Sequence, residues 1–382
     1  MYRSSPPDSR KPETGIARRA TLKANRDPMS NNKAILFEKR GRCGLVTLNR
    51  PRALNALSYP MIAQMEEHYV DWAGDADVYG VVLEAAPGRA FCSGGDLKAL
   101  YEWRREGNTG AIFENYTSEY QHNWTLDRFI KPHVSLMDGF VFGGGVGISL
   151  YGTHKVAGEN YRFAMPETAI GFFPDVGATW FLPRMPGRIG LYLALTGNRI
   201  DRADAYELGL LTHCIDAHEF DAIRAAMCEA DPIDPVLDER HVDPGASALL
   251  QLREEIDRHF AGDSVEEILS SLEGATGPHA EWARETAVKM RRNSPLSLKV
   301  AYWQIRRSPS PALEDALELE GRIARHFLTG EEFYEGVRAL LIDKDNSPKW
   351  SPSALEDISE EMVEAYFAPR EEGAFKPINP FI

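Results

Sequence analysis

The segment GFVFGGGVGISLYG, residues 139–152, constrains the fold of this chain more than any other stretch. It places five glycines between Gly139 and Gly147, among apolar residues that would otherwise suit a buried core. A glycine inside a regular element costs about 0.5–1 kcal/mol relative to alanine, so the bare backbone must serve a purpose. Dinucleotide binding is not that purpose, because Ile148 stands where the G-x-G-x-x-G pattern from Gly143 needs its third glycine.

The alternative purpose is a site built from backbone amides. Glycines between a strand and a helix let a bare N–H point into a cavity, where the helix N-terminus adds partial positive charge. The segment AFCSGGDLKAL, residues 90–100, has the same design, with a helix expected to begin near Asp96. Two such turns can direct two N–H groups at one oxygen and stabilise an oxyanion. Either turn alone is equally compatible with tight strand-to-helix packing.

Two acidic residues lie in the loop-rich segment FAMPETAIGFFPDVGATWFLPR, residues 163–184. Glu167 and Asp175 are surrounded there by proline, glycine and apolar side chains. Such surroundings raise the pKa of a carboxyl group, which suits a general acid or base. Taken alone, Glu167 could be a turn or capping residue and Asp175 an N-cap.

A Ser-His-Asp triad is not indicated. His122, His133 and His154 lie in the same half of the chain, but no G-x-S-x-G nucleophile turn accompanies them.

Strand and helix patterns alternate up to about residue 215, which predicts an α/β fold with buried strands. The segment 34–49 reads as a hairpin around Arg40-Gly41, and a helix with one apolar face is expected from Ser58. From Ala217 the chain is expected to be mostly helical, with helices over 246–260, 265–272, 280–292 and 312–330. The Pro- and Asp-rich residues 230–245 are expected to form a linker or surface loop. The expected parts are a disordered extension (1–32), a core (33–230), a helical region (231–352) and a tail (353–382).

The composition narrows the class of protein. The 382 residues carry a formal net charge of −14, which argues against nucleic acid or an anionic membrane as a partner. No apolar run approaches the roughly 20 residues that span a bilayer, and residues 1–32 lack the apolar stretch of a secretory signal. The four cysteines fit neither a metal site nor a disulfide framework. We therefore expect a protein that is not secreted, in the bacterial cytoplasm or the mitochondrial matrix.

Five motifs in order resemble the crotonase (enoyl-CoA hydratase/isomerase) superfamily over residues 33–352. The motifs are ALNAL (53–57), AFCSGGDLK (90–98), DGFVFGGGVGISL (138–150), FAMPETAIGFFPDVGATWFLPR (163–184) and FYEGVRALLIDKDNSPKW (333–350). The combination resembles the branch that contains the 3-hydroxyisobutyryl-CoA hydrolases, and PETAIGFFPDVG in the fourth motif and EGVRALLIDKDNSPKW in the fifth are most similar to that branch. The resemblance implies a spiral of ββα units with a helical C-terminal region, and an acyl-CoA substrate.

The resemblance also implies roles for single residues. The amides of Gly95 and Gly144 would hold the thioester carbonyl, so a side chain on Gly144 would fill the space meant for the substrate. Glu167 would be the general base that activates water, or the nucleophile, and Asp175 and Glu119 would contact the substrate. Without the resemblance, Glu119 reads as part of a solvated helix face.

One departure from the family pattern favours hydrolysis. Hydratases of the family carry an acid two residues after the glycine triplet, where this chain has Gly147. The resemblance then implies hydrolysis of a short 3-hydroxyacyl-CoA, such as 3-hydroxyisobutyryl-CoA of valine catabolism. Glu167 would activate water or attack the carbonyl. An enoyl-CoA hydratase or isomerase, and a non-catalytic acyl-CoA-binding protein, remain alternatives.

Binding of CoA requires cations, and three candidates fit the family pattern. They are Arg52, Lys98 and Lys344. No cofactor and no metal are expected beyond the CoA of the substrate, and the family pattern makes a homo-oligomer possible.

Overall fold

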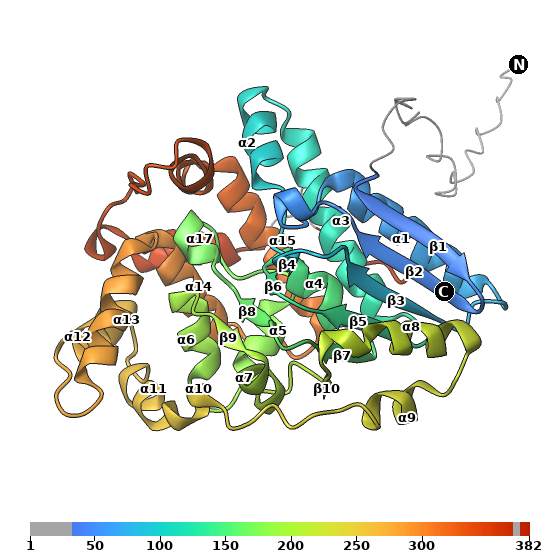
Figure 1. The fold of residues 1–382 in the computed structure, drawn as a ribbon. Coiled ribbons are helices and arrows are strands. Elements are labelled where there is room, and N and C mark those ends of the chain that lie inside the picture. The colour runs from blue at the N-terminus through green and yellow to red at the C-terminus, as the bar shows by residue number, and fades with distance from the viewer. Residues whose placement is uncertain (1–32, 370–374) are drawn as a thin grey trace, which may run out of the picture. The chain divides into compact units, whose positions relative to one another are not determined.

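The computed structural model describes residues 33–369 and 375–382 (Figure 1). The extension that the sequence predicts to be disordered, residues 1–32, lies outside the described residues. Within residues 34–382 the described chain packs as one compact unit. The boundaries expected at residues 230 and 352 stay predictions.

Two sheets organise the first half of the chain. The six-stranded sheet has the order β1-β2-β3-β5-β7-β10 and is parallel except for the β1–β2 hairpin, and the four-stranded sheet has the order β4-β6-β8-β9. The strands are β1 (Ile35–Arg40), β2 (Cys43–Leu48), β3 (Gly80–Ala85), β4 (Ala90–Cys92), β5 (His133–Met137), β6 (Phe140–Phe142), β7 (His154–Ala157), β8 (Arg162–Ala164), β9 (Ile200–Asp201) and β10 (His213–Cys214).

From β3 to β8, successive strands alternate between the two sheets. β3, β5 and β7 belong to the large sheet, while β4, β6 and β8, which follow each of them directly, belong to the small one. Each strand pair leads into helical chain before the next pair begins. The predicted spiral of ββα units is therefore confirmed.

Helices surround the sheets and form most of the second half, where α10–α13 gather on the side away from β1–β3 in Figure 1. The helices are α1 (Tyr59–Gly74), α2 (Leu97–Arg105), α3 (Thr109–Asp127), α4 (Gly144–Leu150), α5 (Ala178–Phe181), α6 (Ile189–Thr196), α7 (Arg202–Glu207), α8 (Phe220–Glu229), α9 (Ile233–Asp238), α10 (Ala248–Gln251), α11 (Arg253–His259), α12 (Val265–Glu273), α13 (Ala280–Arg292), α14 (Pro295–Arg307), α15 (Leu313–Thr329), α16 (Glu332–Val337) and α17 (Glu360–Phe367). None of the helices that the structure describes is long and apolar enough to cross a bilayer.

The prediction of a linker over residues 230–245 is wrong in its first part. Residues 233–238 form α9, whose Ile233 and Leu237 are buried. They belong to a second apolar cluster that also contains Val82 and Val134 of the large sheet. Ile233 and Leu237 are four residues apart and so share one face of the helix. Burial of this apolar face stabilises a helix here, although the Pro- and Asp-rich composition predicts a loop.

The C-terminal tail packs against α3. Phe375 lies edge-on to Tyr120, with ring centroids 5.9 Å apart. The side-chain amide of Gln121 forms two hydrogen bonds with the backbone of Ile378, at 2.7 and 2.9 Å. These contacts hold the end of the tail against α3, so the tail supports the helix that carries Glu119.

Candidate active site

The two glycine turns lie side by side. One follows β4 and the other follows β6, and these strands are parallel neighbours. Parallel neighbours end at the same sheet edge, and a Cβ added to Gly94 would lie only 3.6 Å from the nitrogen of Gly144. Gly94 has φ +99° and Gly143 has φ +49°, a region of backbone conformation that favours glycine. The expected helices, α2 and α4, begin directly after the turns.

Two backbone amides at this junction are unpaired. Neither the nitrogen of Gly95 nor that of Gly144 donates a hydrogen bond to a described residue. Gly144 is the first residue of α4, where backbone amides have no acceptor within the helix. A Cβ on Gly95 would meet no atom within 4 Å, so open space adjoins this residue. The two amides remain available to an external oxygen.

The space beside Gly144 has an occupant that the sequence did not reveal. A Cβ on Gly144 would collide with Oε1 of Glu119, and a Cβ on Gly143 would lie 2.9 Å from Oε1 of Glu167. Both carboxyl groups therefore pack directly against the glycine turn. The sequence predicts that position 144 is glycine to leave room for the substrate. The structure adds a second reason, because a side chain there would also collide with the Glu119 carboxyl.

Three carboxyl groups form one buried cluster beside the turn. Glu119 comes from α3, Glu167 from a 3-10 turn (Glu167–Ile170), and Asp175 from the loop before α5; they are 4%, 6% and 6% exposed. Burial raises the pKa of all three carboxyl groups, and the charge of Asp175 raises the pKa of the other two further. No cation of the described residues forms an ion pair with any of them. Because like charges this close disfavour full ionisation, the cluster retains a proton more readily than isolated carboxylates do.

A sequence profile of the enoyl-CoA hydratase/isomerase family matches residues 43–367, which is most of the chain. The chain belongs to this family.

Relatives within the family carry two kinds of name. The chain is 40% identical to "3-hydroxyisobutyryl-CoA hydrolase, mitochondrial" of Danio rerio over 91% of this chain and 94% of that protein. It is 39% identical to "3-hydroxyisobutyryl-CoA hydrolase 1" of Arabidopsis thaliana, over 89% and 92%. Two solved structures, described as a carnitinyl-CoA dehydratase of Mycobacterium thermoresistibile and an enoyl-CoA hydratase of Rhodobacter sphaeroides, both superpose with a TM-score of 0.84. They are 38% and 37% identical and cover 89% and 90% of this chain, and 98% and 100% of their own.

The position of the second hydratase acid of the family has no room for an acid. A Cβ on Gly147 would lie 2.7 Å from Nδ2 of Asn123 and 2.9 Å from Cβ of Val176. A glutamate there would require both neighbours to move, whereas Asn123 already fills the space. The sequence does not point to Asn123, because nothing in the local pattern of α3 distinguishes it from any other buried helix residue.

The raised pKa values of the cluster predict a pH-dependent stability. Carboxyl groups whose pKa is higher in the folded than in the unfolded state stabilise the fold below their unfolded pKa. This contribution is lost as the pH rises through the folded pKa. We therefore expect Glu119→Gln to exceed the wild type at pH 8 by about 1–3 kcal/mol in the free energy of unfolding, since one pKa unit is worth about 1.4 kcal/mol. The gain should vanish near pH 4, where Glu119 is protonated in both states.

Urea unfolding at pH 8, 6 and 4 measures this effect. Glu114→Gln is the matched control, because Glu114 is an exposed carboxylate of the same helix. It should show no comparable gain. Equal stability of Glu119→Gln and the wild type at all three pH values would contradict the prediction.

Side chains from distant parts of the chain fix the loop that carries Asp175. The hydroxyl of Tyr120 donates to Oδ2 of Asp175 at 2.9 Å. The carboxylate of Glu320, fully buried on α15, accepts from the amides of Gly177 and Thr179 at 2.6 and 2.8 Å and from the Thr179 hydroxyl at 2.7 Å. Sequence reasoning missed Glu320. A glutamate on the apolar face of α15 could have been recognised from the sequence, because a charged residue on a buried helix face needs hydrogen-bond or ion-pair partners.

Replacing Glu320 by glutamine should therefore destabilise the protein. The amide of the variant has one acceptor oxygen, while three donors currently share two carboxylate oxygens. At least one buried donor then loses its acceptor, which costs about 1–3 kcal/mol. Thermal unfolding of Glu320→Gln measures the loss. Glu318→Gln, on the same helix but partly exposed, should leave the unfolding temperature unchanged, and an equal shift in both variants would refute the prediction.

The three cations expected to bind CoA are exposed and lie on separate segments. Arg52 lies in the turn Pro51–Ala53, and Lys98 lies in the first turn of α2. Residues 54–57 run beside residues 93–96, with Leu57 donating to Gly94 at 2.8 Å. Lys344 follows the π-helical turn Arg338–Ile342, which packs against α2. None of these three side chains forms an ion pair with a described residue, so all are available to phosphate groups.

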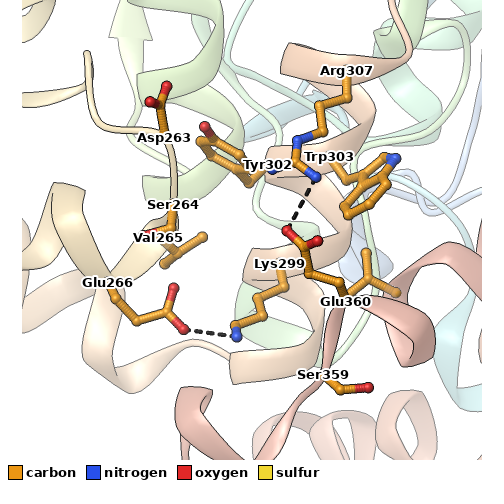
Figure 2. A pocket seen from close by; sticks show the side chains of 11 residues that line it. Asp263, Ser264, Val265, Glu266, Lys299, Tyr302, Trp303, Arg307, Ser359 and Glu360 are labelled. Atoms are coloured by element: carbon orange, nitrogen blue, oxygen red, sulfur yellow. Dashed lines mark hydrogen bonds and ion pairs between the residues drawn. The ribbon is translucent and has the colours of Figure 1, made fainter.

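A pocket between α12, α14 and α17 contains none of the predicted site residues. Figure 2 shows that its cations are directed at acidic neighbours: Lys299 contacts Glu266 at 2.7 Å and Arg307 contacts Glu360 at 3.2 Å. Both cations are already neutralised, so this pocket offers little to the phosphates of CoA.

The sequence predicts neither a disulfide framework nor a metal site. All four cysteines are buried and free. In the described part of the chain, no three His, Cys, Asp or Glu side chains are grouped so that they could hold a metal ion.

Proposed function

We propose that the protein hydrolyses a short 3-hydroxyacyl-CoA thioester, converting 3-hydroxyisobutyryl-CoA to 3-hydroxyisobutyrate and CoA. The observation that carries the proposal is the position of Glu167, whose carboxyl packs against Gly143, next to the unpaired amide of Gly144. An attacking group and a donor for the developing oxyanion are thereby adjacent. The identity to relatives named as hydrolases, about 40% over most of both chains, supports the same reaction.

The first step of the proposed mechanism is binding of the carbonyl. The amides of Gly95 and Gly144 receive the thioester oxygen and strengthen their hold as negative charge develops on it. Each preorganised donor of this kind is typically worth about 2.7–4 kcal/mol of barrier. Arg52, Lys98 and Lys344 would neutralise phosphates at the CoA end.

In the second step Glu167 attacks the carbonyl or removes a proton from an attacking water. On either route a C–O bond forms, the C–S bond breaks, and CoA leaves as a thiolate. After direct attack the acyl group remains on Glu167 as an anhydride, and water then hydrolyses this anhydride to release the hydroxy acid and the free carboxylate. A thiolate is a good leaving group, because thiols ionise at about pH 8.5. Oε2 of Glu167 has no hydrogen-bond partner among the described residues, which leaves it available to react. Glu119 and Asp175 would orient the 3-hydroxyl and the water.

Release of CoA from 3-hydroxyisobutyryl-CoA, followed with a thiol reagent, tests the proposal. The rival activity, hydration of an enoyl-CoA, is followed by the absorbance of crotonyl-CoA. We expect CoA release and no hydration, because Asn123 fills the space of the second acid. Hydration without CoA release would replace the proposal by the hydratase alternative. Tight acyl-CoA binding without either reaction would indicate a non-catalytic binding protein.

Two further expectations belong to the same proposal. Relatives from animals are named as mitochondrial proteins, and we propose the mitochondrial matrix or a bacterial cytoplasm for this chain. We also propose that it requires no cofactor and can assemble with copies of itself. Sedimentation of the purified protein, and activity after dialysis against a chelator, test these two points.

A further inference from the structure

Asn123 is a buried amide without hydrogen bonds. It lies on α3 four residues after Glu119, on the same helix face, and is fully buried. Neither its Nδ2 nor its Oδ1 has a partner among the residues that the structure describes. An asparagine amide can donate two hydrogen bonds and accept two, and buried polar groups are rarely left without any. Such a group indicates a missing polar partner.

The Asn123 amide lies beside Gly147 in the wall of the carboxyl cluster. Nδ2 of Asn123 lies 2.7 Å from the point where Gly147 would carry a Cβ, and Val176, next to Asp175, is the other neighbour. The amide therefore occupies the space into which an acid at position 147 would project. It is thus part of the wall that Glu119 and Asp175 also form.

The proposed substrate says what belongs at this place. Apart from its thioester, the acyl group carries one polar group, the 3-hydroxyl. This hydroxyl is two carbons away from the carbonyl, so a carbonyl held at the two glycine turns brings it to the adjoining wall. A hydroxyl both donates and accepts, and so does an amide.

Resting on the hydrolysis proposed above, we infer that Asn123 binds the 3-hydroxyl of the acyl group, which Glu119 and Asp175 help to orient, and that its amide is the main source of selectivity for 3-hydroxyacyl thioesters over unsubstituted ones. Because its amide is neutral at all physiological pH values, Asn123 holds the hydroxyl without acting as a second acid or base. The hydroxyl is therefore retained during hydrolysis and not expelled as water.

The test compares 3-hydroxyisobutyryl-CoA with isobutyryl-CoA, which lacks only the hydroxyl. We expect the wild type to prefer the hydroxylated thioester in kcat/KM by about 10- to 100-fold, because the analogue without a hydroxyl leaves a buried amide without its hydrogen-bond partner. Asn123→Ala should lose most of this preference through a fall in activity on the hydroxylated substrate alone. Asn123→Ser, which keeps a donor and an acceptor, should recover part of it.

Isobutyryl-CoA also serves as the internal control for folding, since its turnover should be the same in the wild type and Asn123→Ala. Gln121→Ala is the matched control. It removes another amide of α3, one that binds the backbone of Ile378, and it should keep the wild-type preference. An equal fall on both substrates in Asn123→Ala, or a wild type without preference, would overturn the inference while leaving hydrolysis intact. A wild type that releases CoA from neither thioester would instead remove the proposed function.

Discussion

Glu167→Gln is expected to lower kcat for CoA release by about 10²–10⁴-fold, the usual contribution of one acid–base group. A glutamine keeps the size and the Oε1 contact with Gly143, but it neither accepts a proton at neutral pH nor attacks a carbonyl. Its effect should therefore fall on kcat, while KM changes little because CoA and the carbonyl are bound by other groups. Steady-state kinetics with 3-hydroxyisobutyryl-CoA measure both constants.

The fold should survive this substitution. Burial raises the pKa of Glu167, so its charged form is disfavoured in the folded protein. Exchange for a neutral amide should leave the thermal unfolding temperature equal or higher. Glu84→Gln is the control, because Glu84 is a carboxylate outside the cluster that pairs with Arg224 at 3.1 Å. Wild-type turnover by Glu167→Gln, or an equal loss in Glu84→Gln, would remove Glu167 from the chemistry.

Features encoded by neighbouring residues were predictable from the sequence. The helix after the SGGD turn begins where Asp96 was expected, and the Asp96 carboxylate caps it by accepting from Ala99. The α13 helix covers residues 280–292 as the pattern indicated. In contrast, α14 was overlooked, although Ser294 at its N-cap and Pro295 at its first position are standard start signals. These start signals are local, so α14 too is encoded by neighbouring residues.

Features that depend on distant residues were not predictable in this way. Tyr120 reaches Asp175 across 55 residues, and Glu320 reaches Thr179 across 141. No local pattern encodes such pairs, because the fold alone brings the partners together. The same holds for Asn123 and Gly147. The sequence shows that an acid is missing at position 147, and only the packing of α3 against α4 shows what stands in its place.

The two glycines that present the unpaired amides should respond differently to alanine. At Gly95 a Cβ meets no atom within 4 Å and φ lies outside the left-handed region, so Gly95→Ala keeps its N–H in place. We expect its kcat/KM to stay close to that of the wild type. At Gly144 a Cβ collides with the Glu119 carboxyl. Gly144→Ala should lower kcat/KM by about 10²–10³-fold, the usual loss when an oxyanion donor no longer reaches its target.

A combined variant separates the two causes of that loss. Glu119→Ala removes the carboxyl that a methyl group at position 144 would strike. If the collision displaces the α4 amide, Gly144→Ala made in the Glu119→Ala background should cost much less than in the wild type, and the two substitutions will not be additive. If the methyl group itself excludes the thioester, the cost will be the same in both backgrounds. Equal activity of Gly144→Ala and the wild type would show that the backbone at Gly144 does not approach the substrate.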